Sequence, residues 1–510
     1  MRFDCVVVGG GTNGLTAALL LCKGGRRVGL FEARMELGGL AASEEFHSGF
    51  HSLGVLHDTG CVRTGAVQAL GLAQHGLRFA ARRPAVLGLG GLGGTGPGLL
   101  LDPDPERAAD ELGRHAPGDH AAYGEYRAFL ERVSPVLRKL IDQAPPDLEP
   151  SSFSDYLGLL RLGVSVRRLG RRDLLELARI TPMCVADWLR ARFKSDLLQA
   201  LLAAPALEGA FAGPWSPGTA INLLLREAAL GPEVEGGAPA LVRALVSACR
   251  AAGVELRTGQ RVAGFEIQGG AVTGVRLESG ERIESRQVLS SLDPRQTFLK
   301  LVPPGRLPIR FTRRIENWRL RGTTAKLDLA LSGPISFAGR AGQPIEAART
   351  GGHLDHLERA FDAVKYRTCS KRPLLDLRLS PPAADTAPVA SVLVRYVPRH
   401  LDGGFDERAR ERLLASCIEE LGRHLPGLKD AIVASRLRTP EDLENDFGLS
   451  GGHLQHGEIA LDQLLSMRPD HDCSRYQTPI EGLFLCGSGS HPGGGLTLGP
   501  GWQCARTLLA

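Results

Sequence analysis

Apolar residues near the N-terminus are grouped in a pattern that predicts a strand, a turn, a helix and a second strand. Residues 3–8 form a short, continuous, valine-rich run, which is typical of a strand buried on both faces. The apolar positions over 15–22 follow a helical period, and 27–32 form a second buried strand. This order predicts the beginning of a parallel α/β domain.

The turn between the first strand and the helix carries three glycines in the spacing that binds dinucleotides. Gly9 permits the tight turn, Gly11 lets the backbone approach a pyrophosphate, and Gly14 lets helix and strand pack closely. The helix N-terminus offers free N–H groups to the phosphates. Glu32, at the end of the second strand, can accept hydrogen bonds from ribose hydroxyls. The alternative is the glycine turn of an ordinary parallel-sheet protein, which the full strand–helix–acid context disfavours.

The C-terminal stretch has a similar order of strand, glycine-rich loop and helix. Residues 483–486 are expected to form a buried strand, and a helix is expected near Pro500, because proline suits the first helical turn. The loop between them, 487–499, is rich in glycine and can therefore lie against a flat ring system. The N-terminus of the helix can stabilise negative charge on such a ring. The alternative is a glycine-rich tail, which the flanking strand and helix disfavour.

Between the two ends, the pattern predicts a third piece of the same domain and two insertions. The third piece is a helix followed by short strands, expected at 254–257, 262–268 and 272–277. The first insertion has a glycine-rich turn at 88–98, expected to be a hairpin tip or loop. Its later part is helical and would form a cap over a substrate, with helices expected at 108–142, 154–169, 172–193 and 197–211.

Composition excludes several classes of protein. The 510 residues are enough for two or three domains with a sizeable core. The net charge of +5 and the aromatic content of 5% disfavour nucleic acid as a partner. The ten cysteines include no CxxC pair, so we expect free thiols in a reducing compartment and no dithiol centre. No metal is expected, because the His453–His456 pair lacks an evident third ligand.

The sequence predicts a cytoplasmic protein. It opens directly into the first strand, and no apolar run reaches the roughly 18 residues of a membrane span. Residues 156–177 mix leucines with arginines. They could form a membrane-surface helix that helps to extract a lipid-like substrate, or a cap helix with a solvated basic face; the second is favoured because such faces are common. The sequence leaves the oligomeric state unknown.

Four stretches carry a resemblance to a known family. They are "EARMELGGLAAS" (32–43), "RGTTAKLDLAL" (321–331), "GGHLQHGEIALDQLLSMRP" (451–469) and "GLFLCGSGSHPGGGLTLGPG" (482–501). They resemble motifs of the FAD-dependent phytoene desaturase and amine oxidase superfamily, near the branch of pyridine nucleotide-disulfide oxidoreductase domain-containing protein 2. The branch typically has His where this chain has Thr12. The absence of CxxC excludes the disulfide chemistry in the branch's name.

The resemblance implies the fold and the cofactor. The fold class is α/β: a Rossmann-like, glutathione-reductase-like FAD-binding domain from 1–75, 233–299 and 446–510, with a discontinuous α+β substrate or cap domain from 76–232 and 300–445. The cofactor is FAD. The residues expected to bind it are Gly9, Gly11, Asn13, Gly14, Glu32, Ala33, Gly38, Gly39, Leu40, Val262, Gly487, Ser488, Gly493, Gly494, Gly495 and Leu496.

The resemblance also implies an FAD-dependent oxidoreductase of phytoene-desaturase type. Such an enzyme transfers hydride from a hydrophobic small molecule to flavin N5 and forms a C=C or C=N bond; the direction of reaction stays open. Candidates for proton handling are His456, Glu458 and His491. The alternative is that these residues are structural, with Asp462 and Arg468 holding the segment against the FAD domain. His51 and His57 are further candidates for the cavity wall.

Two other functions stay open. An amine oxidase on the same scaffold would need a lysine linked through water to flavin N5, and Lys326 is one candidate, although strand packing explains it equally well. A non-catalytic escort or binding protein of the same fold is disfavoured by the intact glycine motifs at both ends.

Overall fold

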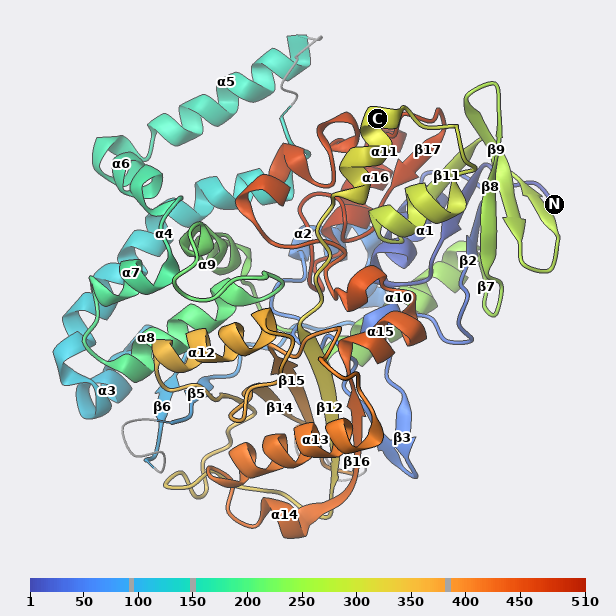
Figure 1. The fold of residues 1–510 in the computed structure, drawn as a ribbon. Helices are drawn as coiled ribbons and strands as arrows, with labels where there is room; N and C mark the ends of the chain where they lie inside the picture. The colour runs from blue at the N-terminus through green and yellow to red at the C-terminus, as the bar shows by residue number, and fades with distance from the viewer. Residues whose placement is uncertain (91–95, 147–152, 381–386) are drawn as a thin grey trace.

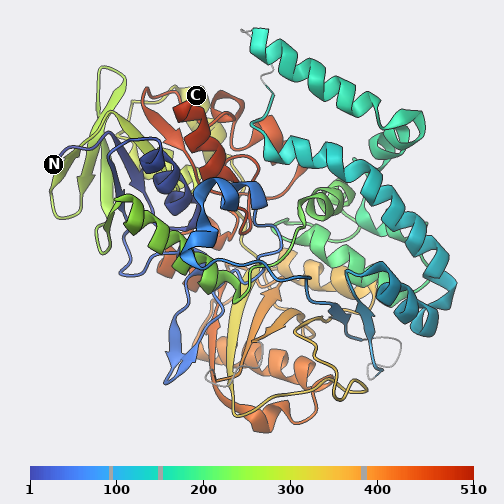
Figure 2. The same cartoon turned by 180° about the vertical axis from the view of Figure 1, so that it is seen from behind.

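The computed structural model describes residues 1–90, 96–146, 153–380 and 387–510 (Figure 1). The chain builds two large sheets and a helical layer. Both termini lie beside the first sheet, and the second sheet lies at the opposite end of the molecule (Figures 1 and 2). The helical layer flanks the second sheet on one side. The predicted α/β fold with a separate α+β part is confirmed.

The first sheet is parallel and has the strand order β17-β11-β1-β2-β7. Its strands are β1 (Cys5–Val8), β2 (Val28–Phe31), β7 (Glu255–Arg257), β11 (Gln287–Ser290) and β17 (Leu483–Leu485). All five lie within the three segments that we predicted for the FAD-binding domain. The exact domain limits stay a prediction.

Each face of the first sheet is covered by its own core, because neighbouring side chains along a strand point to opposite faces. Cys5 and Val7 pack against a helical layer of α1 (Thr12–Lys23), α10 (Gly237–Ala252) and α16 (Gly499–Leu509). Val6 and Val8 pack against a small antiparallel sheet of β8 (Val262–Gln268), β9 (Ala271–Leu277) and β10 (Arg282–Glu284).

Helices from the two ends of the chain are in direct contact. A Cβ atom on Gly501, in α16, would collide with the backbone carbonyl of Asn13, in α1. The Asn13 side-chain amide also donates a hydrogen bond of 3.1 Å to the Ser488 hydroxyl. The glycine therefore allows the C-terminal helix to approach the N-terminal helix closely.

The second sheet has the order β16-β12-β15-β14-β13-β5-β6 and is antiparallel except for the β13–β5 pair. Its strands are β5 (Val86–Gly88), β6 (Leu99–Leu101), β12 (Thr324–Leu331), β13 (Ala347–Arg349), β14 (Leu374–Leu379), β15 (Val389–Arg395) and β16 (Ile432–Arg438). Helix α13 (Glu407–Gly422) packs on one face through Leu413, Cys417 and Leu421. The glycine-rich turn joins β5 to β6 as a hairpin, and its residues 91–95 lie outside the described part.

Proline divides the predicted cap helices. The expected helix 108–142 is two helices, α3 (Pro105–His115) and α4 (His120–Asp142), separated by Pro117. Likewise, 172–193 is divided near Pro182 into α6 (Gly170–Ile180) and α7 (Val185–Arg190). Proline lacks the N–H needed inside a helix, so each expected helix was too long. The other cap helices are α5 (Phe153–Arg167), α8 (Asp196–Ala203) and α9 (Thr219–Ala229), with the 197–211 prediction ending early at Pro205.

The remaining helices complete both parts. They are α2 (Thr64–Leu70), α11 (Ile309–Glu316), α12 (Leu354–Lys365), α14 (Leu428–Ala431) and α15 (Pro440–Phe447), and a short pair, β3 (Glu45–His47) and β4 (Phe50–His51), forms a hairpin. All ten cysteines are free thiols. No helix in the described ranges has the length and apolarity needed to cross a bilayer.

Candidate functional site

The N-terminal glycines form a tight cradle before α1. Gly9 has a φ of +96°, and a Cβ on Gly14 would collide with the carbonyl of Gly9. A Cβ on Gly11 would meet nothing within 4 Å, so this residue faces open space. Gly11 is the N-cap of α1, and no side chain caps the helix. The first-turn N–H groups therefore offer a binding site for a pyrophosphate.

A second glycine loop lies against the first. The Gly38 N–H donates a hydrogen bond of 2.8 Å to the carbonyl of Gly10, and a Cβ on Gly39 would lie 3.1 Å from the Gly11 Cα. Both residues have positive φ angles, which favours glycine. Ala33 and Leu40, at the two ends of this segment, are half-buried.

The carboxylate of Glu32 lies beside the cradle. Its Oε2 accepts a hydrogen bond of 2.6 Å from the Gly10 N–H, and its Oε1 accepts one of 2.8 Å from the Arg34 N–H. This places an acceptor next to the helix N-terminus, where the ribose of a dinucleotide would follow the pyrophosphate. The donor and acceptor set fits the pyrophosphate and ribose of FAD.

The C-terminal loop lies close to the cradle. Gly493 and Gly495 have φ angles of +105° and +80°, and a Cβ on Gly495 would meet nothing within 4 Å. Gly494 packs against the side chain of Gln455, and Gly487 packs against the carbonyl of Ser291. The Asn13–Ser488 hydrogen bond joins this loop to the N-terminal unit. Leu496 and Val262 are buried in the two cores that flank the first sheet.

Arg468 organises the C-terminal loop, a role that the sequence pattern does not specify. Its side chain is 0% exposed, and its guanidinium donates hydrogen bonds to five backbone carbonyls: those of Gln455, Gly457, Glu458, Gln463 and Ser488. Burial lowers the pKa of Arg468 to about 9. Asp462 instead pairs with Arg319, whose Nη2 lies 2.6 Å from Oδ1. Backbone acceptors leave no side-chain motif, so the arrangement could not be found from spacing.

The predicted proton-handling residues are buried. Burial would raise the pKa of Glu458, but ion pairs with Arg321 at 2.6 Å and Arg319 at 3.3 Å outweigh it and hold the pKa below its ordinary value. Burial lowers the pKa of His456, and that of His491 to about 3. The two histidines are therefore neutral at neutral pH. Catalytic roles for these three residues stay a prediction.

A buried lysine forms a polar cluster on β12. Lys326 is 1% exposed, and its Nζ lies 3.2 Å from His57 Nδ1, 3.7 Å from the Asp328 carboxylate and in hydrogen-bonding contact with the Ser391 hydroxyl. Burial lowers the pKa of Lys326 to about 8, although Asp328 opposes the shift. Burial and then the Lys326 charge hold the pKa of His57 well below its usual range. A lysine and a histidine that are both near neutrality can exchange a proton.

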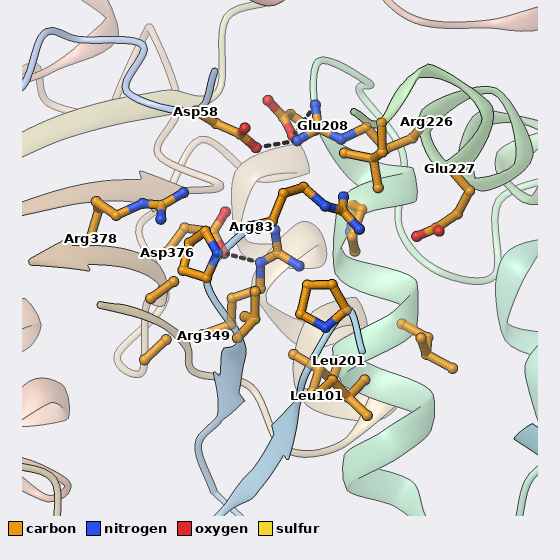
Figure 3. Close-up of a pocket in the computed structure, with 18 of the residues that line it drawn as sticks. Asp58, Arg83, Leu101, Leu201, Glu208, Arg226, Glu227, Arg349, Asp376 and Arg378 are labelled. Carbon is orange, nitrogen blue, oxygen red and sulfur yellow. Dashed lines mark hydrogen bonds and ion pairs between the residues drawn. The ribbon is translucent and has the colours of Figure 1, made fainter. Parts of the chain in front are cut away.

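A cavity of about 170 Å³ lies between the second sheet and the helical layer (Figure 3). His57 and Asp58 line it together with residues of α4, α8, α9 and strands β5, β6, β13, β14 and β15. His57 also lines a larger adjoining cavity of about 690 Å³, whereas His51 is exposed on β4.

The cavity wall is connected to both glycine loops. The Leu56 N–H donates to the carbonyl of Leu40, and the Arg63 N–H donates to the carbonyl of Thr497, at 2.9 and 3.1 Å. The segment between them carries His57 into the cavity wall. This places the cavity beside the loops that fit FAD.

The chain is similar to known proteins along its whole length. The family model described as flavin containing amine oxidoreductase matches residues 14–497. The pyridine nucleotide-disulfide oxidoreductase domain-containing protein 2 of Rattus norvegicus is 32% identical, covering 100% of this chain and 93% of the relative. One of the subunits of limonene dehydrogenase from Castellaniella defragrans is 26% identical, covering 99% and 94%. A solved structure of putrescine oxidase bound to putrescine matches with a TM-score of 0.62 and 16% identity, covering 100% and 98%, which indicates a shared fold.

Replacing Arg468 is expected to loosen the C-terminal loop. The change Arg468→Gln leaves several buried carbonyls without donors, each at a cost of about 1–3 kcal/mol. We expect a lower melting temperature and less FAD retained per protein after gel filtration, measured by absorbance of released flavin. Arg306→Gln, at an exposed arginine, is the matched control and should retain FAD. Equal FAD content in both variants would contradict the role assigned to Arg468.

Proposed function

The chain belongs to the flavin containing amine oxidoreductase family, and we propose that within it the chain acts as a dehydrogenase that forms a C=C bond in a small molecule. It is an FAD-dependent oxidoreductase, as its family membership and the geometry of its glycine loops establish. The observation that carries the carbon-bond proposal is the similarity along nearly the whole chain to a protein of limonene dehydrogenase, whose name gives a hydrocarbon as substrate.

The cavity walls support the binding of an apolar carbon skeleton. Leu101 and Leu201 line the cavity and, with neighbouring apolar side chains, can hold such a skeleton and exclude water. Bound FAD supplies a two-electron acceptor that takes up hydride from a substrate carbon. The neighbouring carbon must then lose a proton to a residue of the chain.

We assign the proton to the pair of His57 and Lys326. His57 lines the cavity and is neutral, so it can accept a proton from a bound substrate. Its Nδ1 lies 3.2 Å from Lys326 Nζ, and the lysine can take the proton onward when it is unprotonated. We favour this pair over the predicted His456, Glu458 and His491, because it reaches the cavity.

An amine oxidase is the second candidate function. It is supported by the buried, easily deprotonated Lys326 and by the family's description. The two candidates predict different products: a carbon substrate loses two hydrogens and keeps its skeleton, whereas an amine is converted to an imine that hydrolyses.

The proposed function is tested by anaerobic reduction of the holoenzyme. Limonene, geranic acid and primary alkylamines are added separately, and bleaching of the flavin absorbance is followed in a stopped-flow instrument. We expect a carbon substrate to bleach the flavin and to yield a product lighter by two hydrogens in mass spectrometry. Bleaching by amines alone, with release of ammonia on hydrolysis, would replace the proposal by the amine oxidase function.

The role of Lys326 predicts a pH dependence. Because the pKa of Lys326 is lowered to about 8, the residue loses its proton as pH rises through that value. We expect the rate of flavin reduction to rise with pH and level off above about 8. Lys326→Met should slow reduction about 100-fold and remove this rise, since general-base catalysis contributes about 10²–10⁴-fold. Lys300→Met, at an exposed lysine, is the control; an unchanged pH profile in Lys326→Met would refute the assignment.

A further inference from the structure

Charged residues form most of the polar wall of the cavity beside His57. Six arginines line it, and five of these are ion-paired: Arg127 with Glu227, Arg226 with Asp58 and Glu208, Arg349 and Arg395 with Asp376, and Arg378 with Glu233. The remaining acid of the wall, Asp102, lies 3.7 Å from Arg107. Each acidic group of this wall therefore already faces a cation.

Arg83 is the exception among the arginines of this cavity. It is half-buried, and it makes no hydrogen bond or ion pair with any residue of the described ranges. It lies among the charged residues labelled in Figure 3. Arg83 also lines the larger adjoining cavity, so it lies where the two meet, as does His57. A guanidinium in this position has five N–H donors available to a ligand.

We propose that Arg83 binds a carboxylate carried by the substrate, whose apolar part lies along the leucines of the cavity. This inference rests on the proposed function and narrows its substrate to a carbon skeleton with an anionic end. The planar guanidinium fork matches a carboxylate bidentately, and partial burial strengthens the pair. An ammonium group finds no free acid in this wall, so an amine substrate is disfavoured. Burial also raises the pKa of Glu233, which weakens the negative charge nearby.

Binding of unreactive ligands tests this inference separately from turnover. Oxidised holoenzyme is titrated calorimetrically with hexanoate, hexanol and hexylamine, which share an apolar chain and differ in their charge. We expect hexanoate to bind, and the other two to bind at least about tenfold more weakly, because a charge-assisted hydrogen bond contributes that much. Tighter binding of hexylamine, or equal binding of all three, would overturn the inference.

The arginine itself is tested by Arg83→Gln, Arg83→Lys and the control Arg78→Gln. Arg78 lies in the same segment, is exposed and lines neither of these two cavities. We expect Arg83→Gln to weaken hexanoate about tenfold or more, Arg83→Lys to restore part of the affinity and the control to match the wild type. Unchanged affinity in Arg83→Gln would overturn the inference. Because no electron transfer is measured, this result is independent of whether the carbon-bond function holds.

A different observation concerns the outer side of the helical layer. Helix α5 projects from the body of the molecule (Figures 1 and 2). Tyr156, Leu160 and Val164 follow one another at a spacing of four, which places them on one helix face, and they are 60%, 63% and 40% exposed. Leu175, on α6, is 58% exposed. These side chains form an apolar strip on the outside of the molecule.

Basic residues accompany the strip. The exposed arginines are Arg161, Arg167, Arg168, Arg171 and Arg172, and none is ion-paired with a described residue. The acids of α6 are already engaged, since Asp173 pairs with Arg132 and Glu176 with Arg179. We infer that this surface docks on an anionic lipid membrane, with the apolar side chains in the interface and the arginines beside the headgroups.

Vesicle flotation of the holoenzyme tests the membrane inference. We expect binding to phosphatidylcholine vesicles that contain phosphatidylserine, weaker binding without it, and release at high salt. Arg167→Gln with Arg168→Gln should weaken binding about fivefold per arginine, and Leu160→Ser should weaken it further. Leu461→Ser, at a leucine 46% exposed elsewhere, is the control. No binding, or a concentration-dependent dimer that Leu160→Ser abolishes, would overturn the inference, the dimer in favour of contact between copies.

Discussion

The close packing of α16 on α1 is the contact on which the cofactor site depends. Because Gly501 has no side chain, the C-terminal helix reaches the backbone of Asn13 at the start of α1. The Asn13–Ser488 hydrogen bond then fixes the C-terminal loop beside the cradle. Neither end of the chain can enclose a dinucleotide by itself: one supplies the phosphate cradle, and the other supplies the loop for the ring. Two segments separated by most of the sequence therefore form one binding site.

The first sheet and its cofactor loops were predictable because their physics is local. A valine run buried on both faces, a glycine that must adopt a positive φ and an acid after the second strand each leave a mark within a few residues. The strands of β1, β8 and β17 accordingly begin and end within one or two residues of the expected limits. The cap helices were predicted less well, because the apolar period continued across Pro117 and Pro182 and the breaking effect of proline was given too little weight.

The polar groups that decide the chemistry were largely beyond prediction. Arg468 is bonded to backbone carbonyls, which every sequence offers, so its partners cannot be read from residue type. Lys326 and His57 are 269 residues apart and meet only because β12 packs next to the segment after the second glycine loop. The free state of Arg83 depends on all the other arginines of the cavity having found acids. Such properties belong to the whole arrangement and not to any motif.

The cavity itself combines two demands that oppose each other. A hydrocarbon substrate needs leucine walls that exclude water, while catalysis needs groups that carry charge, and charge is costly to bury without a partner. The chain meets both demands by pairing its buried charges, as in Arg378 with Glu233, so that the wall is nearly neutral and rigid. Against such a background, a single unpaired guanidinium dominates the local field. Substrate selection in this protein is then governed less by the many charges that line the cavity than by the one that has no partner.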